Sequence, residues 1–239
     1  MDMTILLPVI AAILALAVVA MVLWLAKRSA LLKDQLIPQI PPNRQTFSLA
    51  RSQMAFWFAI ILASFLCLFM ETQSTDVISA QALMLMGLSA LTAGGGTMVD
   101  RVRDTPEDAV NDALRALGLS NYQDVVSLET TVAALLARGD TLTVPEKAQL
   151  NDRLLLLQTY KNRTRPFETD GWFRDLTTDI DGTALHRLQA LVWTAIIGSI
   201  FVYQVYQTRA MPLLNENLLL LMGLSNAGYV GFKSNETQY

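Results

Sequence analysis

The sequence predicts an all-α, polytopic membrane protein with five transmembrane helices, a parallel two-helix repeat and a small cytosolic helical insert. Three observations indicate this class. Only 16% of the residues are charged, against about a quarter in soluble domains. Apolar runs long enough to cross the roughly 30 Å hydrocarbon core of a bilayer recur along the chain. The tetrapeptide MGLS occurs at residues 86–89 and again at 222–225.

The two tetrapeptides belong to a longer repeat. With an offset of 136 residues and no gap, residues 49–100 align with 185–236, and 16 of the 52 positions are identical. The identical positions of the first helix share one helical face, and those of the second include small residues, which let membrane helices approach closely. We therefore expect two hairpins of the same orientation, related by a pseudo-twofold axis along the membrane normal.

The charges predict how the five spans cross the membrane. The expected spans are 4–26, 48–70, 81–99, 184–206 and 218–232. The first is too long for a typical signal-peptide core and no positive charge precedes it, so we expect it to be retained. With the N-terminus outside, 17 of the 18 lysines and arginines are cytoplasmic, and Arg209 is the exception. This predicts a multi-pass protein of the cell inner membrane with a cytoplasmic C-terminus.

Aromatic residues are expected to mark the two membrane surfaces, because their rings favour the headgroup level. Trp24, Trp57 and Trp193 fall near the predicted inner interface, where Arg187 also lies, and Tyr203 and Tyr206 fall near the outer one. The aromatic pattern thus agrees with the distribution of positive charge.

The chain divides into a membrane part and a polar insert. The insert is expected to hold three helices, one from Pro106 to a stop near Gly118, one over 122–138 ending at Gly139, and one over 145–161 after the cap Thr143. At about 65 residues it is near the lower size limit for an independent core, so we expect it to pack on the membrane helices, a second subunit or a partner. The expected division is an N-terminal transmembrane helix (1–30), a Pro-rich cytosolic connector (31–47), hairpin repeat 1 (48–100), the cytosolic insert and linker (101–182), hairpin repeat 2 (183–233) and a cytosolic tail (234–239).

The linker before the fourth span is expected to be irregular. Residues 162–181 are polar, and residues 171–174 are typical of a segment at the membrane surface. Asp181, Gly182 and Thr183 are expected to cap the fourth span.

Two interpretations of the repeated helices remain open. The interiors of the expected spans contain no Asp, Glu, Lys, Arg or His, which argues against a proton relay, a voltage sensor or a charge-coordinating transporter. The shared residues either pack helices together, the interpretation that we favour, or line a pore with neutral groups. The residues concerned are Gly87, Ser89, Thr92, Gly95, Gly223, Ser225, Asn226 and Gly231.

The C-terminal quarter resembles a group of uncharacterised bacterial multi-pass membrane proteins. The resemblance is carried by FRDL at 173–176, Asp179, Asp181-Gly182, HRxQ at 186–189, Val192-Trp193, Met211-Pro212, LMGLS at 221–225 and GYxGFK at 228–233. The group usually continues with Pro-Glu, where this chain has Ser234-Asn235-Glu236. Through the repeat the resemblance extends to the second and third spans, and it implies a fold but no activity.

No enzymatic motif accompanies this fold. The sequence has no Gly-rich phosphate loop after a strand, no nucleophile elbow and no HExxH. Asp175, Asp179 and Asp181 do not have the spacing of an EF-hand loop, and Cys67 is the single cysteine. We expect no catalytic site, cofactor, metal or nucleic-acid partner.

The leading hypothesis is therefore a non-enzymatic protein that contacts membrane lipids. It is expected to form a homo-oligomer and to act as an anchor or scaffold for a cytosolic protein bound through residues 104–170. The alternatives are a small oligomeric channel lined by the two MGLS helices, and an accessory subunit of a larger membrane complex.

Overall fold

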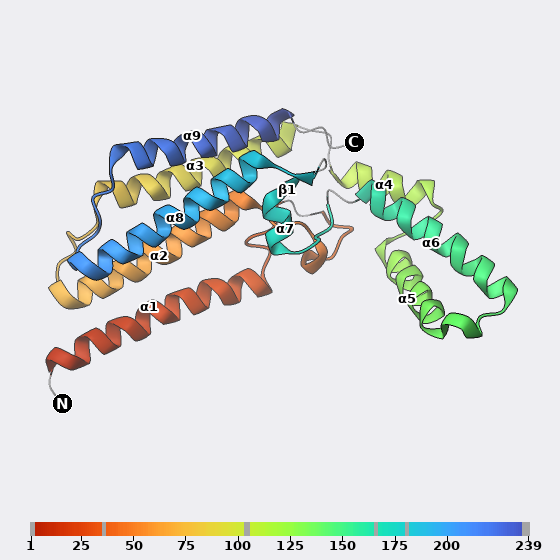
Figure 1. The fold of residues 1–239 in the computed structure, drawn as a ribbon, viewed down its shortest axis with the longest axis horizontal. Coiled ribbons are helices and arrows are strands. Elements are labelled where there is room, and N and C mark those ends of the chain that lie inside the picture. The colour runs from red at the N-terminus through yellow and green to blue at the C-terminus, as the bar shows by residue number, and fades with distance from the viewer. Residues whose placement is uncertain (1–2, 35–36, 103–105, 165–166, 180–181, 236–239) are drawn as a thin grey trace.

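The computed structural model describes residues 3–34, 37–102, 106–164, 167–179 and 182–235, and it is almost entirely helical (Figure 1). The expected all-α class is confirmed. Outside these ranges lie Arg103, Arg165, Asp181 and the cap expected at Thr105. The long helices are α1 (Met3–Arg28), α2 (Leu49–Thr72), α3 (Ala80–Val102), α8 (Leu185–Thr208) and α9 (Glu216–Asn235).

Three helices among the described residues are long and apolar enough to cross a membrane. They are Val9–Arg28 within α1, Leu49–Thr72 and Leu185–Thr208. The helices α3 and α9 lie alongside this set at the positions of the third and fifth expected spans (Figure 1). The structure is thus that of a membrane protein with at least these three candidate spans.

The helices α2, α3, α8 and α9 form one bundle, in which α2 packs against α8 and α3 packs against α9. Its centre is apolar. Trp57, Ile197 and Phe201 are fully buried there, and the rings of Trp57 and Phe201 meet edge to face with centroids 6.2 Å apart. A Cβ on Gly198 would overlap the Phe56 ring, so a larger residue where α8 crosses α2 would force this ring to move.

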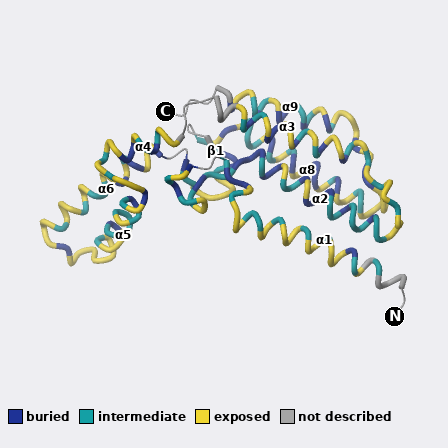
Figure 2. The backbone as a smooth tube through the Cα atoms, turned by 180° about the vertical axis from the view of Figure 1, so that it is seen from behind, coloured by how far each residue is buried: buried dark blue, intermediate teal, exposed yellow. Residues whose placement is uncertain are grey.

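The helix α1 packs mainly along α2 and leaves its other face uncovered. Ala11 is buried, whereas Ile13, Leu16 and Leu23 are more than half exposed, as expected for side chains that meet lipid rather than protein (Figure 2).

The two ends of the bundle differ. The hairpin loops 73–79 and 209–215 lie at the same end as the N-terminus, and the connector and the insert lie at the other (Figure 1). The loops touch each other, because Ser79 Oγ donates to the Pro212 carbonyl at 3.1 Å and Arg209 pairs with Glu71 at 2.6 Å. One end of the bundle therefore consists of two short loops in contact with each other, whereas the other end carries the connector, the insert and the linker.

The insert consists of α4 (Pro106–Ala116), α5 (Tyr122–Arg138) and α6 (Val144–Thr164), close to the expected bounds. Gly118 and Gly139 follow the first two helices with φ of +67° and +49°, a conformation that favours glycine and ends a helix. A capping box of Asn121 and Asp124 begins α5.

The connector completes the core of the insert. Ile37 and Ile40 are buried with Val110 and Leu114 of α4 and with Tyr160 of α6. We expected this core to be completed by membrane helices, a second subunit or a partner. The Pro-rich connector contains a 3₁₀ turn at Pro42–Arg44. Gln45 holds it folded, because its buried Nε2 donates to the carbonyls of Ile37 and Ile40 at 2.8 and 2.6 Å.

The linker after α6 is more regular than expected. It contains α7 (Trp172–Thr177) and a short antiparallel pair, β1 (Thr178–Asp179) with β2 (Gly182–Thr183). The expected cap of the fourth span was wrong for Gly182 and Thr183, because these residues pair with β1. The residue before α8 is Ala184, which makes no side-chain cap bond.

A buried ion pair joins the connector to the end of α9. Lys233 Nζ lies 3.1 and 3.2 Å from the two carboxylate oxygens of Asp34, and the Lys233 side chain is only 3% exposed. Burial alone would raise the pKa of Asp34, but the charge and hydrogen bond of Lys233, together with the charge of Arg187 and a hydrogen bond from Ser48, hold that pKa below its usual value.

The variant Lys233→Met should lower the free energy of unfolding by about 3 kcal/mol, because it leaves the Asp34 charge without its buried partner. Thermal or denaturant unfolding in detergent measures this. The matched control is Arg209→Gln, which removes the more exposed pair with Glu71 and should cost less than about 1 kcal/mol.

The stabilisation should also depend on pH. Because the folded state lowers the pKa of Asp34, the contribution is complete above the unfolded pKa of about 4 and is lost as the pH falls through the folded pKa. Equal stability of Lys233→Met and the unmodified protein at neutral pH would contradict the assignment.

Candidate functional site

The repeated residues of α3 and α9 meet in a close-packed seam. Ser89 and Thr92 are almost fully buried, and their hydroxyls donate to the carbonyls of Met86 and Leu88 in their own helix, each at 2.8 Å. Such bonds satisfy a hydroxyl inside a membrane helix without a partner on another helix. Both hydroxyl groups therefore already have a hydrogen-bond acceptor within α3.

The four glycines of the repeat have different surroundings. A Cβ on Gly95 would lie 3.3 Å from Val230 Cγ1, and one on Gly223 would lie 3.8 Å from Leu88 Cδ2. Gly87 and Gly231 are exposed, and a Cβ on either would meet nothing within 4 Å. The structure thus places Gly95 and Gly223 in the α3–α9 seam and leaves Gly87 and Gly231 on its outside.

Polar side chains cross the bundle at two further places. Gln53 Nε2 of α2 donates to Thr194 Oγ1 of α8 at 2.7 Å, and Gln189 Nε2 of α8 donates to Ser225 Oγ of α9 at 3.3 Å. The identity of Gln53 and Gln189 in the repeat was the signal for these contacts, although the sequence did not indicate their partners. They link α2 to α8 and α8 to α9.

Asn226 is buried in the same seam. It is 3% exposed, and neither its Oδ1 nor its Nδ2 has a hydrogen-bond partner among the described residues. The seam as a whole favours the packing interpretation, because its serines, threonine and inward glycines contact neighbouring helices or bond within them.

The expected interface anchors behave differently from one another. Trp24 is 54% exposed, with the Arg28 guanidinium 5.4 Å from its ring centre, and Trp193 is half-buried. The expectation for Trp57 was wrong, because its ring is buried in the bundle core. Arg187 lies 5.6 Å from the ring centre of Tyr229 in α9 and reaches the Asp175 carbonyl of α7 at 3.5 Å. It contacts protein on two sides.

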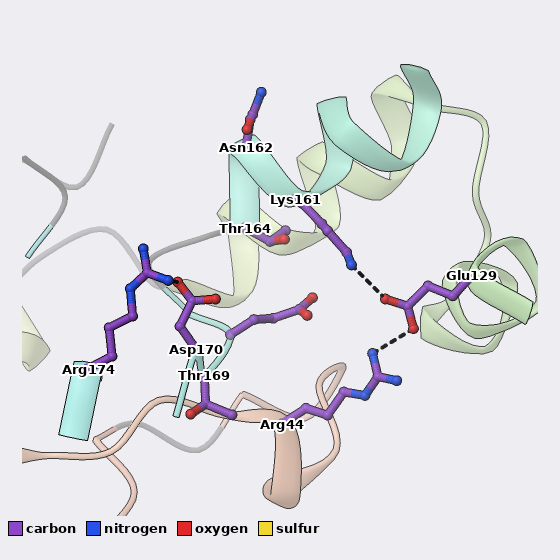
Figure 3. A pocket seen from close by; sticks show the side chains of 9 residues that line it. Arg44, Glu129, Lys161, Asn162, Thr164, Thr169, Asp170 and Arg174 are labelled. Atoms are coloured by element: carbon purple, nitrogen blue, oxygen red, sulfur yellow. Dashed lines mark hydrogen bonds and ion pairs between the residues drawn. The ribbon is translucent and has the colours of Figure 1, made fainter. Parts of the chain in front are cut away.

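A polar pocket that the sequence did not indicate lies where the insert, the connector and α7 meet. Its volume is about 510 Å³ (Figure 3). Its lining is charged and hydrogen-bonding, and comes from the connector, α5, α6, the linker and α7. The lining residues are Arg44, Glu129, Lys161, Asn162, Thr164, Glu168, Thr169, Asp170 and Arg174.

Backbone pairing creates this pocket. Thr46 N donates to the Phe167 carbonyl at 3.3 Å and Thr169 N donates to the Arg44 carbonyl at 2.9 Å, so the connector runs beside the linker. Asp175 then holds both, because its Oδ2 accepts from Phe47 N at 3.0 Å and from Thr169 Oγ1 at 2.6 Å. Segments about 120 residues apart in sequence thereby form one wall.

Three ion pairs surround the pocket. Glu129 of α5 lies 2.7 Å from Arg44 and 3.1 Å from Lys161, so two cations share one carboxylate. Arg174 lies 3.6 Å from Asp170, and both side chains are about half exposed. The Arg44–Glu129 pair connects the connector to the insert, and the Lys161–Glu129 pair joins α6 to α5 within the insert. The Arg174–Asp170 pair contributes least to stability, because it is the longest and the most exposed of the three.

Glu168 is the acid in this pocket without such a pair among the described residues. It lines the pocket, and its buried Oε1 has no partner at hydrogen-bonding distance among the described residues, although the Tyr160 hydroxyl lies near its carboxyl group. Burial raises the pKa of Glu168 above its usual value. Among the described residues no three His, Cys, Asp or Glu side chains gather in a way that could hold a metal ion.

Comparison with known proteins returned no match among family models, curated proteins or solved structures. Any function for the seam or the pocket must therefore be argued from their own residues.

The structure of the seam predicts that the same substitution destabilises the protein at one glycine of α3 and has little effect at another. Gly95→Leu should lower the free energy of unfolding by about 1–3 kcal/mol, because the side chain has to displace Val230 and part α3 from α9. Gly87→Leu adds the same side chain where no atom lies within 4 Å and should change stability by less than about 0.5 kcal/mol. Thermal unfolding in detergent distinguishes them, and equal effects would show that Gly95 is not in a packed seam.

Proposed function

We propose that this chain is a non-enzymatic membrane anchor that holds a helical module, α4 to α6, at the cytoplasmic surface for a protein partner. The observation that carries the proposal is the separate core of the module. Val110, Tyr122, Val132 and Leu157 pack with one another and with the connector, and none belongs to the core of the membrane bundle. A module built this way extends from the bundle and leaves most of its surface open (Figure 2).

Exposed apolar side chains on the module support a partner. Leu136 of α5 is 54% exposed, and Val144 and Leu155 of α6 are 83% and 65% exposed. Other apolar residues of the same two helices are buried in the core of the module. Large exposed apolar side chains mark an interaction site where they lie together, so these three are the candidate contacts with a protein partner.

The five-span topology is part of the same proposal. The apolar α1, α2 and α8 are joined by α3 and α9, which alternate in direction with them (Figure 1). Among the described residues, the end that carries the connector and module also carries every lysine and arginine except Arg209, which favours a cytoplasmic location for that end. An inner-membrane location and an external N-terminus follow from this assignment, and the pairing of α2 with α8 and α3 with α9 supports a repeat with twofold symmetry.

Assembly into a homo-oligomer, or into a larger membrane complex, is supported by the outside of the bundle. Gly87 and Gly231 are exposed there beside large apolar side chains such as Leu91 and Leu224, and small residues permit close approach of another helix. The channel alternative gains no such support, because the buried Ser89, Thr92, Ser225 and Asn226 lie in a packed seam rather than on an open path.

Site-specific photocrosslinking tests the proposal. With p-benzoylphenylalanine at Leu155, cells should yield one discrete protein adduct, because this side chain lies on the open surface of the module. The control position is Asp76, in the loop at the opposite end of the bundle, which should yield no such adduct. Crosslinking is preferable to deleting the module, because deletion would expose Ile37 and Ile40 of the connector.

The absence of any adduct from Leu155, Val144 and Leu136 together would contradict the scaffold proposal. An adduct from Asp76 of the same mass as that from Leu155 would contradict it as well.

A further inference from the structure

The polar pocket contains one acid that its ion pairs do not include. Arg44 and Lys161 share the single carboxylate of Glu129, and Arg174 is paired with Asp170. Glu168 remains, in the interior, with an acceptor oxygen that has no hydrogen-bond partner among the described residues. A buried acceptor left in this state costs free energy, so the interior of the pocket favours a group that donates hydrogen bonds.

The mouth of the pocket has the opposite preference. The side chains of Arg174 and Lys161 are 58% and 54% exposed, and the pair of Arg174 with Asp170 is long at 3.6 Å. Pairs of this kind contribute little to stability and exchange readily, so either cation can turn to an incoming acidic group. Asn162, Thr164 and Thr169 supply further hydrogen-bonding groups between the two regions.

We propose that this pocket binds a small zwitterion, with its primary ammonium group on Glu168 and its acidic group on Arg174 and Lys161. A volume of about 510 Å³ suits a ligand of this kind, because small-molecule sites usually measure about 300–1,000 Å³. A metal ion is a poor alternative, since no three suitable ligands gather among the described residues. A simple anion is also a poor alternative, because it would approach Glu168, Glu129 and Asp170.

The ligand has two possible sources, an ethanolamine phospholipid headgroup or a soluble zwitterion. Trp172 and Phe173 stand beside Arg174 on α7 and are 46% and 63% exposed, as expected for side chains that rest at a membrane surface. In either case the ligand joins the module, the connector and α7, because all three line the pocket. This site is independent of the scaffold proposal, since it requires no protein partner.

The test uses the full chain in phosphatidylcholine nanodiscs, titrated with glycerophosphoethanolamine and followed by isothermal calorimetry. Binding should be saturable, and Glu168→Gln should weaken it about tenfold or more by removing the charged acceptor. Arg174→Gln should weaken it too. Glycerophosphocholine, whose quaternary ammonium cannot donate a hydrogen bond, should bind more weakly. The control Asp152→Asn changes an exposed acid of α6 outside the pocket and should leave binding unchanged.

A second arm distinguishes the sources. In nanodiscs made with phosphatidylethanolamine, a site filled by the lipid headgroup no longer responds to the soluble probe, whereas a site for a free zwitterion still does. No saturable binding in phosphatidylcholine nanodiscs, or equal binding by Glu168→Gln with an unchanged Tm, overturns the proposal.

Discussion

The buried ion pair between Asp34 and Lys233 is the contact on which the half of the structure that carries the module depends. It fixes the connector against the end of α9, at the point where the membrane bundle stops. From this point the connector runs beside the linker, contributes Ile37 and Ile40 to the core of the module, and lines the polar pocket with Arg44. The pair is costly to break, because the Lys233 side chain is only 3% exposed and removal of either partner leaves a poorly solvated charge. It therefore gives the connector a fixed position rather than that of a flexible link.

Inside the bundle, the bilayer imposes a different constraint. Backbone groups must be paired within each helix, and polar side chains must bond nearby. Gln53 with Thr194 and Gln189 with Ser225 meet this requirement between helices, and Ser89 and Thr92 meet it within α3. The resulting core has few positions where a large side chain can be added, as Gly95 and Gly198 show. These residues therefore make packing contacts, whereas Asn226 of the same seam makes no hydrogen bond among the described residues.

Local patterns made much of this predictable. Glycine stops and caps marked the ends of α4 and α5, and apolar length marked α1, α2 and α8, because these signals act within a few residues of the chain. Contacts between distant segments were not predictable. A proline-rich stretch such as 31–47 indicates no helix, but nothing in it indicates that Ile37 and Ile40 lie against α4 and α6.

The residues of the seam and the pocket also fall into a group that the sequence indicated and a group that it did not. Gly95, Ser89 and Ser225 could be found because the repeat names equivalent positions, whereas Glu168 and Arg44 of the pocket belong to no motif. Trp57 shows the limit of position along a span as a guide. It stands where an interface tryptophan is expected, yet its side of the helix faces the core. Depth in the membrane can be estimated from sequence, but which neighbours cover a face depends on the assembled bundle.

The most direct test of the topology is cysteine labelling with a membrane-impermeant maleimide in intact cells, in a Cys67→Ala background. Ser74→Cys lies in the α2–α3 loop, and Asp140→Cys lies in the module after α5. If the bundle spans the membrane with the module inside, the Ser74 position is labelled from outside, and the Asp140 position is labelled only after the inner membrane is permeabilised. Labelling of both positions from outside, or of Asp140 alone, would contradict the proposed arrangement.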